Sequence, residues 1–273
     1  MLKVPLPEQL SDRALMLLLG GICLLFILFI FLPLAAVFLN LDLEKITLQL
    51  ENPQILSALT VGLVTSFIAT VTSFVFGVPT AYLLATKKFP GRSLVDTILD
   101  IPIVLPPAVA GVALLLAFAP RGLLGPTLRE FGVILPGSTL AVVLAQVFVA
   151  SPFLLRSAKA AFENVDRALI DSAKILSASR LRVFLTITLP LATHGLVAGA
   201  IMTWARSMGE FGATLMFAGN LPGVTQTMPL AIYMLLAEDP LASNVLSAIL
   251  VLVSFTVLAL FRLLGRRRYG ARL

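Results

Sequence analysis

Charged residues are scarce in this sequence. Only 12% of its 273 residues are charged, about half of the ~25% that is usual in soluble domains. The deficit comes from long apolar runs, each at or near the ~20 residues that a membrane-crossing helix needs. These runs cover residues 14–39, 55–85, 94–119, 138–155, 191–217 and 241–264. They leave no room for a separate soluble domain and predict an all-α, polytopic membrane protein with six transmembrane helices.

Residues that commonly carry chemistry are also few. The sequence has one cysteine, Cys23, and one histidine, His194, which excludes disulfides and cysteine metal sites. No Gly-x-x-x-x-Gly-Lys-Ser/Thr segment is present, so the chain alone lacks the loop that cradles ATP phosphates. We therefore expect a non-catalytic membrane subunit with no metal or cofactor of its own. An intramembrane enzyme is disfavoured because no catalytic cluster is visible.

The basic residues predict the orientation. If the N-terminus is cytoplasmic, most of the 20 lysines and arginines fall on the cytoplasmic side. Lys45, Arg121 and Arg129 fall outside, and Arg206 lies within a span. Because cytoplasmic loops are enriched in Lys and Arg, both termini are predicted to be cytoplasmic. The pI of about 9.9 then reflects topology and contact with anionic lipid, and it does not indicate nucleic-acid binding.

These features divide the chain into three parts. Residues 1–54 are predicted to be a cytoplasmic lead, the first transmembrane helix and an external loop. Residues 55–262 form a membrane domain of five helices with a short cytoplasmic helix, and residues 263–273 form a basic cytoplasmic tail. Residues 119–137 and 219–240 are predicted to be external loops because they are rich in proline, glycine and polar residues.

The third apolar run contains an unusual density of helix breakers, namely Pro102, Pro106, Pro107 and Gly111. A proline at membrane depth frees a carbonyl group that only neighbouring protein or water can satisfy. The segment is therefore expected inside the helix bundle, either beside an internal pathway or as a packing kink.

The fifth run carries two opposite charges, Arg206 and Glu210, at a spacing that places both on one helix face. Ionisable residues within spans are functional candidates because they are costly to insert. Two interpretations stay open: a structural ion pair, within the helix or between subunits, or a role at the external end of a pathway for a charged solute. The fifth run also contains four glycines, which allow helices to approach closely: Gly195, Gly199, Gly209 and Gly212. The run is therefore expected to be a dimer-interface helix lining that pathway.

Residues 162–190 interrupt the apolar sequence with a hydrophilic stretch. Asn164 or Asp166 can cap a helix there, and Leu169, Ala173 and Leu176 recur at helical spacing on one face. A short amphipathic helix on a cytoplasmic loop suits docking into a groove of a partner protein.

The same stretch resembles the signature loop of permease subunits in ATP-binding-cassette (ABC) importers. The family pattern is Glu-Ala-Ala, three residues, Gly, and a later hydrophobic-x-Leu-Pro. Here it reads Asp171-Ser172-Ala173, Ser177 and Ile187 to Leu189-Pro190. Asp171 replaces Glu and keeps the charge, and Ser177 replaces Gly and stays small. The resemblance implies an ATPase-coupling loop formed by Asp166, Leu169, Asp171, Ser172, Ala173, Leu176, Ser177, Ala178 and Ser179.

Three further motifs are similar to the oxyanion importer permeases for molybdate, tungstate and sulfate, and most similar to the molybdate branch. They are Ile101-Pro102 to Pro106-Pro107, Ala205-Arg206-Ser207-Met208-Gly209-Glu210-Phe211-Gly212-Ala213, and Thr225-Gln226-Thr227 to Ala231-Ile232-Tyr233. The resemblance implies a type I ABC importer permease fold in the inner membrane. Its implied partners are a second copy of the chain, two cytoplasmic ATPase subunits that bind ATP and Mg, and an external substrate-binding protein.

Molybdate is the expected substrate, with sulfate or tungstate as alternatives. Pathway, gate or dimer-interface roles are expected for Pro106, Pro107, Arg206, Gly209, Glu210, Phe211 and Gly212. A rival from another class is an ion-coupled secondary carrier or channel, with Arg206 and Glu210 as coupling charges.

Overall fold

The computed structural model describes residues 12–41 and 43–269, and over these residues the chain is built from helices joined by short loops. The predicted all-α fold is confirmed. In chain order the helices are α1 (Asp12–Leu39), α2 (Leu43–Glu51), α3 (Pro53–Thr86), α4 (Arg92–Val104), α5 (Pro107–Phe118), α6 (Gly125–Glu130), α7 (Thr139–Glu163), α8 (Arg167–Ile175), α9 (Arg180–Val183), the π-helical turn η1 (Phe184–Thr188), α10 (Leu189–Met208), α11 (Gly212–Ala218), α12 (Met228–Glu238) and α13 (Pro240–Tyr269).

Five helical segments are long and apolar enough to cross a membrane. They are α1, α3, α7, the continuous segment from α9 through α10, and α13. A sixth span exists if α4 and α5 are counted together, although the two helices are bent by 117° at their break. The predicted third span over residues 94–119 is therefore a broken one: the chain turns at Leu105 and Pro106, within the segment where helix breakers were noted.

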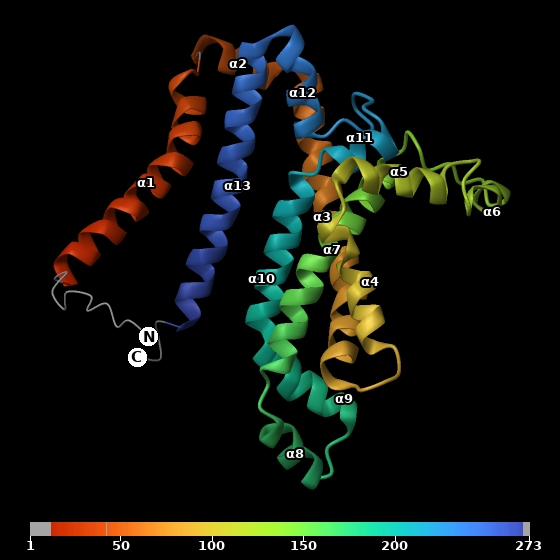
Figure 1. Cartoon of the computed structure of the whole chain (residues 1–273). Coiled ribbons are helices and arrows are strands. Elements are labelled where there is room, and N and C mark those ends of the chain that lie inside the picture. The colour runs from red at the N-terminus through yellow and green to blue at the C-terminus, as the bar shows by residue number, and fades with distance from the viewer. Residues whose placement is uncertain (1–11, 42, 270–273) are drawn as a thin grey trace, which may run out of the picture.

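The packed core is a bundle of α3, α7 and α10 (Figure 1). The buried face of α3 consists mainly of small residues, among them Ala58, Gly62, Ala69, Gly77 and Ala81. Small side chains let helix backbones approach closely, which replaces the hydrophobic driving force that is missing inside lipid. The buried face of α7 is built in the same way, with Ala141, Ala145, Ala150 and Ala158.

Helix α10 packs against α7 at Gly195 and Gly199, two of the glycines expected to allow close helix approach. A Cβ atom added to Gly195 would lie 2.4 Å from the Cβ of Ala161, and one added to Gly199 would lie 2.9 Å from the Cβ of Ser157. Both glycines are therefore needed for close packing within one chain. The expected contact of this helix with a second copy stays a prediction.

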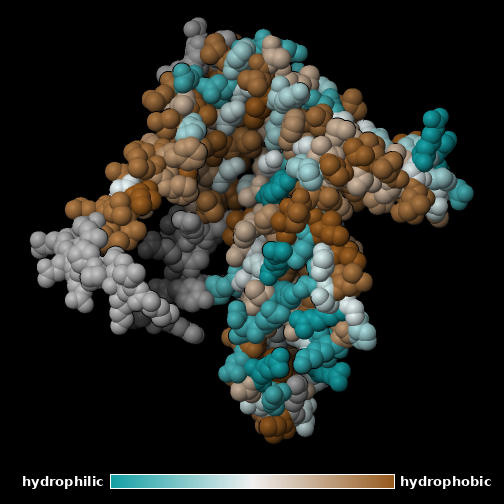
Figure 2. Space-filling view, viewed as in Figure 1, coloured by the Kyte–Doolittle hydropathy of each residue, from teal (hydrophilic) through white to brown (hydrophobic). Residues whose placement is uncertain are grey.

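Helix α1 lies apart from the bundle, beside α13 (Figure 1). Its large apolar side chains are exposed from Leu15 to Leu34, and hydrophobic colour covers the visible part of this arm in Figure 2. Asn244 on α13 anchors the end of α1 by donating hydrogen bonds to the carbonyl oxygens of Val37 and Asn40, at 3.1 and 3.0 Å. Such a surface is suited to lipid or to another transmembrane helix.

Two other segments differ from expectation. Residues 41–53, expected to be a loop, contain α2, and α13 continues without a break through residues 262 and 263 to Tyr269. The predicted boundary between membrane domain and tail is therefore not marked by a change of structure. The predicted N-terminal lead lies outside the described residues up to residue 11, as does the end of the tail from residue 270.

Candidate functional site: an exposed helical hairpin and a junction of two helix breaks

The hydrophilic stretch forms a hairpin of α8 and α9 at one end of the bundle (Figure 1). Hydrophilic residues gather over this end of the molecule in Figure 2. Helix α7 ends at Glu163, and the backbone N–H of Ala168 donates to Asp166 Oδ1 at 2.9 Å. Of the two predicted caps, Asp166 is therefore the one that caps α8, whereas Asn164 ends α7.

The predicted apolar face of α8 is open. The exposed fractions are 47% for Leu169 and 82% for Leu176, and Ile175 is exposed to the same extent as Leu176. Asp171 and Ser172 are also exposed on this helix, while Ala173 is half-buried. An exposed apolar patch with a charged rim at the tip of a membrane protein is suited to protein–protein contact.

Ser177 ends α8 in the left-handed conformation. Its φ is +59°, and it is the only residue other than glycine with positive φ in the described part of the chain. The N–H of Ala178 donates to the carbonyl oxygen of Ala173 at 3.1 Å, which is the 6→1 bond of a Schellman cap. Glycine is favoured at such a position because it lacks Cβ, which explains why the family pattern has Gly there. Ser179 then caps α9 by accepting from the N–H of Arg182 at 3.3 Å.

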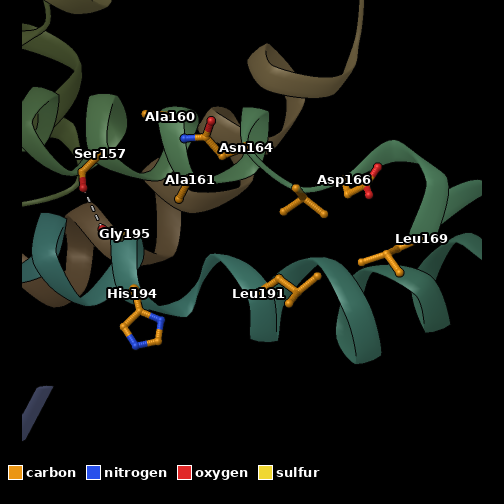
Figure 3. Close-up of a pocket in the computed structure, with 10 residues that line it drawn as sticks. Ser157, Ala160, Ala161, Asn164, Asp166, Leu169, Leu191, His194 and Gly195 are labelled. Atoms are coloured by element: carbon orange, nitrogen blue, oxygen red, sulfur yellow. Dashed lines mark hydrogen bonds between the residues drawn. The ribbon is translucent and has the colours of Figure 1, made fainter. Parts of the chain in front are cut away.

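A groove of about 580 Å³ lies between the end of α7, the start of α8 and the start of α10. Figure 3 shows Ser157 and Asn164 on one side of this groove, His194 and Leu191 on the other, and Leu169 of α8 at one end. Ser157 Oγ donates to the carbonyl oxygen of Gly195 at 2.7 Å and joins the two walls. Because α8 forms part of the groove, a movement of α8 against the bundle changes its shape.

The predicted gate residues lie at the other end of α10, where the fifth span also breaks. Helix α10 ends at Met208, and α11 starts at Gly212. The prediction of one continuous span over residues 191–217 is therefore wrong, because the chain turns through Gly209, Glu210 and Phe211. The Glu210 N–H closes this turn on the carbonyl oxygen of Ser207 at 3.1 Å.

The breaks in the third and fifth spans touch each other. A Cβ atom added to Gly212 would lie 2.7 Å from the Cβ of Pro107, and one added to Gly111 would lie 2.6 Å from the Cβ of Met216. Helices α5 and α11 thus pack at a distance that side chains at these glycines would prevent. We call this region, residues 105–107 of one break and 206–212 of the other, with Pro107 packed on Gly212, the helix-break junction.

Arg206 and Glu210 form an ion pair inside this junction. Arg206 Nη1 lies 2.6 Å from Glu210 Oε2, and the other carboxylate oxygen accepts from the N–H of Ala213 at 2.8 Å. The Glu210 side chain is 1% exposed and the Arg206 side chain 29%. Burial of a carboxylate is tolerated only when it is paired and hydrogen-bonded, so Glu210 joins the end of α10 to the start of α11. The two charges were expected on one helix, but Glu210 lies beyond its end.

The structure also places here one residue that the sequence analysis did not select. Gln146 of α7 is fully buried, and its Nε2 donates to the carbonyl oxygen of Ser207 at 3.1 Å. The sequence signal for Gln146 was a lone amide side chain in an apolar run.

Two further predicted gate residues lie in this turn. Phe211 packs against Tyr233 of α12, with ring centroids 5.2 Å apart. Gly209 has no close neighbour, since an added Cβ would meet only Ala205 O at 3.6 Å.

Solved structures with the same architecture define the class. A bacterial ABC transporter that imports the acidic polysaccharide alginate matches 94% of this chain and 96% of its own chain, with a TM-score of 0.76 at 17% identity. The methionine ABC transporter in an inward-facing conformation matches 80% of this chain and 95% of its own, with a TM-score of 0.62 at 19% identity. The fold is that of type I ABC importer permeases, as predicted.

The sequence comparison identifies the family. Residues 77–269 match the model of the binding-protein-dependent transport system inner membrane component, and the chain belongs to this family of multi-pass inner-membrane permeases. The molybdenum transport system permease protein ModB of Mycobacterium tuberculosis is 41% identical over 85% of this chain and 88% of its own length. ModB of Escherichia coli K12 is 38% identical, over 78% and 96%. The sulfate transport system permease protein CysT of Escherichia coli K12 is 35% identical, over 92% and 94%.

Proposed function

We propose that this chain is the non-catalytic transmembrane subunit of an ATP-driven importer for a tetrahedral oxyanion, with molybdate as the substrate. The observation that carries the proposal is the capped α8 hairpin with its open apolar face, on a chain 38–41% identical to molybdenum permeases. Because a short helix at a membrane protein's tip gains affinity by inserting its apolar face into a groove, α8 is the site where an ATPase subunit docks.

The proposed assembly contains two copies of this chain, two cytoplasmic ATPase subunits and an external binding protein. ATP and Mg are bound by the ATPase subunits. The α8 end of the bundle and both termini face the cytoplasm, as the distribution of basic residues favours. The binding protein docks on the opposite face, at residues 119–137 and 219–240, and α1 meets lipid with its exposed apolar surface.

Transport follows an alternating-access cycle. Closure of the ATPase subunits displaces α8, and the displacement opens and closes the helix-break junction at the other end of the bundle. Arg206 and Glu210 shape the outer part of the pathway: Glu210 fixes the guanidinium, and the exposed part of Arg206 attracts an anion. Selection among oxyanions rests mainly with the binding protein.

Reconstitution tests this proposal directly. The permease with its cognate ATPase and binding protein in liposomes is expected to accumulate molybdate only when ATP is present. Asp171→Arg reverses a charge on the exposed surface of α8 and is expected to abolish uptake while the folded permease stays in the membrane. Glu51→Arg makes the same kind of change on α2, on the other face of the membrane, and should transport normally. Uptake driven by an ion gradient without any ATPase would reject the importer and favour a secondary carrier.

Sulfate is the second candidate substrate, because the similarity to CysT extends over 92% of this chain. Competition of molybdate uptake by sulfate and tungstate, measured with the binding protein present, ranks the three oxyanions. Stronger accumulation of sulfate than of molybdate at equal concentrations would reassign the substrate within the same class.

A further inference from the structure

Three ion pairs connect α4 to the end of α7. Each helix carries three charged residues at spacings of three or four, so each set lies on one helix face. The pairs are Arg156 Nε–Asp100 Oδ1 at 2.7 Å, Lys159 Nζ–Asp96 Oδ2 at 2.6 Å and Arg92 Nη2–Glu163 Oε1 at 3.4 Å. We call this set the ion-pair ladder.

The order of charges fixes the register of the two helices. If α4 slipped by one turn along α7, Arg92 would lie opposite Lys159. A slip in the other direction would bring Asp96 opposite Glu163. Like charges at such distances are destabilising, so either slip replaces an attraction with a repulsion. Helix α4 has no fully buried residue, and Leu99 is its half-buried apolar contact with the core beside α7, so the ladder supplies the charge-specific part of its attachment.

The ladder lies between the two candidate sites along the chain. At one end, Glu163 is the last residue of α7, and α8 begins at Arg167 after a short loop. At the other end, α4 leads through Leu105 to Pro107, which packs on Gly212 in the helix-break junction. One continuous set of contacts from α8 to the junction therefore runs through the end of α7, the ladder and α4, beside the direct route along η1 and α10.

We propose that the ion-pair ladder makes α4 and the end of α7 move as one rigid unit, which transmits the displacement of α8 to the helix-break junction. This inference rests on the proposed ATP-driven import. The six ladder residues are positioning residues: they hold the unit together and do not contact the substrate. Without the ladder, the ATPase still turns over, but less of its movement reaches the pathway.

The functional test separates coupling from folding. In liposomes with the complete transporter, Lys159→Gln is expected to lower molybdate uptake per ATP hydrolysed by about two- to thirtyfold, the range spanned by measured couplings between linked residues. ATP hydrolysis stimulated by the binding protein should persist. Lys87→Gln is the matched control. It removes an exposed cation that follows α3, at the same end of the bundle as the ladder, and should not change the ratio of uptake to ATP hydrolysis.

A charge exchange and a distance measurement complete the test. Asp100→Arg with Arg156→Asp restores opposite charges across one rung and should recover uptake lost in either single variant. In a Cys23→Ser background, spin labels at Thr97→Cys on α4 and Ala160→Cys on α7 should keep one distance with and without trapped ATP.

Each outcome is decisive. If the distance between the two spin labels changes with ATP in a chain with an intact ladder, α4 and the end of α7 do not move as one unit. This result would reject the proposal even if the ladder variants fail to fold. A Lys159→Gln transporter with an unchanged uptake ratio overturns the coupling role while leaving the importer intact. Absence of ATP-dependent uptake by the unaltered complex would instead reject the proposed function.

Discussion

The α8–α9 hairpin and the helix-break junction differ in the sequence separation of the residues that hydrogen-bond or pack together in them. In the hairpin, Asp166 and Ser179 bind amides two or three residues away. In the junction, Gln146 reaches a carbonyl oxygen 61 residues away, and Gly212 meets Pro107 from another helix. The hairpin depends on local sequence and leaves its apolar face exposed, whereas the junction is built by tertiary contacts and buries its carboxylate.

This comparison predicts that changes in the junction cost much folding energy and that changes in the hairpin cost little. The largest effect is expected for Arg206→Ala, because the remaining Glu210 carboxylate is almost fully buried. Removing one partner of a buried ion pair costs about 3–5 kcal/mol. Denaturation of the purified permease complex in detergent should show this loss of stability.

The double variant Arg206→Ala, Glu210→Ala serves as the control for this prediction. It removes the buried charge together with its partner, so the complex should be more stable than the single Arg206→Ala variant. A single variant as stable as the unaltered protein would show that water or another group already neutralises Glu210, and the contrast between the two regions would weaken.

This difference in sequence separation also explains which features could be predicted from the sequence. The helix α8 was predicted from local signals, namely a cap at Asn164 or Asp166 and the spacing of Leu169 and Leu176, whereas the second helix of the hairpin, α9, was not predicted. A kink was one of the two expectations for the third span, from Pro102, Pro106 and Pro107, but the angle between its two helices was not predicted. Proline shows where a helix can break, but the angle of 117° depends on the packing of α5 against α11.

The ion pairs illustrate the same limit. The spacing of Arg206 and Glu210 indicated a pair, and the pair is present, but the helix end at Met208 placed Glu210 on a turn. The ladder between α4 and α7 joins residues 56 to 71 positions apart, and no sequence pattern brought them together. Local periodicity identifies helices and caps; partners between helices require their mutual arrangement.

A second prediction compares two glycines of the same motif. Gly212→Ala places a methyl group 2.7 Å from the Cβ of Pro107, and overpacking of this kind costs about 1–3 kcal/mol. Gly209→Ala meets only Ala205 O at 3.6 Å, an ordinary contact, and should change stability by less than about 0.5 kcal/mol. Melting curves of both variants in detergent measure the difference. Equal losses would mean that the two helix breaks do not depend on close contact.

The smallest effect is expected in the hairpin, for Ser177→Gly. Serine in the left-handed region costs about 1–2 kcal/mol, while glycine loses about 0.5–1 kcal/mol through its greater freedom when unfolded. The net gain is therefore at most about 1.5 kcal/mol and local to the end of α8. Hydrogen exchange in the full-length permease should slow at the amides of Leu176 and Ala178, which donate to Ser172 and Ala173, with no change at the helix-break junction.

Ser177→Val is the matched opposite of this change, because a β-branched residue at a φ of +59° is strongly disfavoured. It should speed exchange at the same two amides and leave the remainder of the permease unaltered. If Val slowed exchange, or if either variant altered the junction, α8 would not be the locally determined element that its short-range hydrogen bonds indicate. Uptake by the Gly variant should remain normal, since the substitution adds no charge and leaves the proposed docking face of Leu169 and Leu176 unchanged.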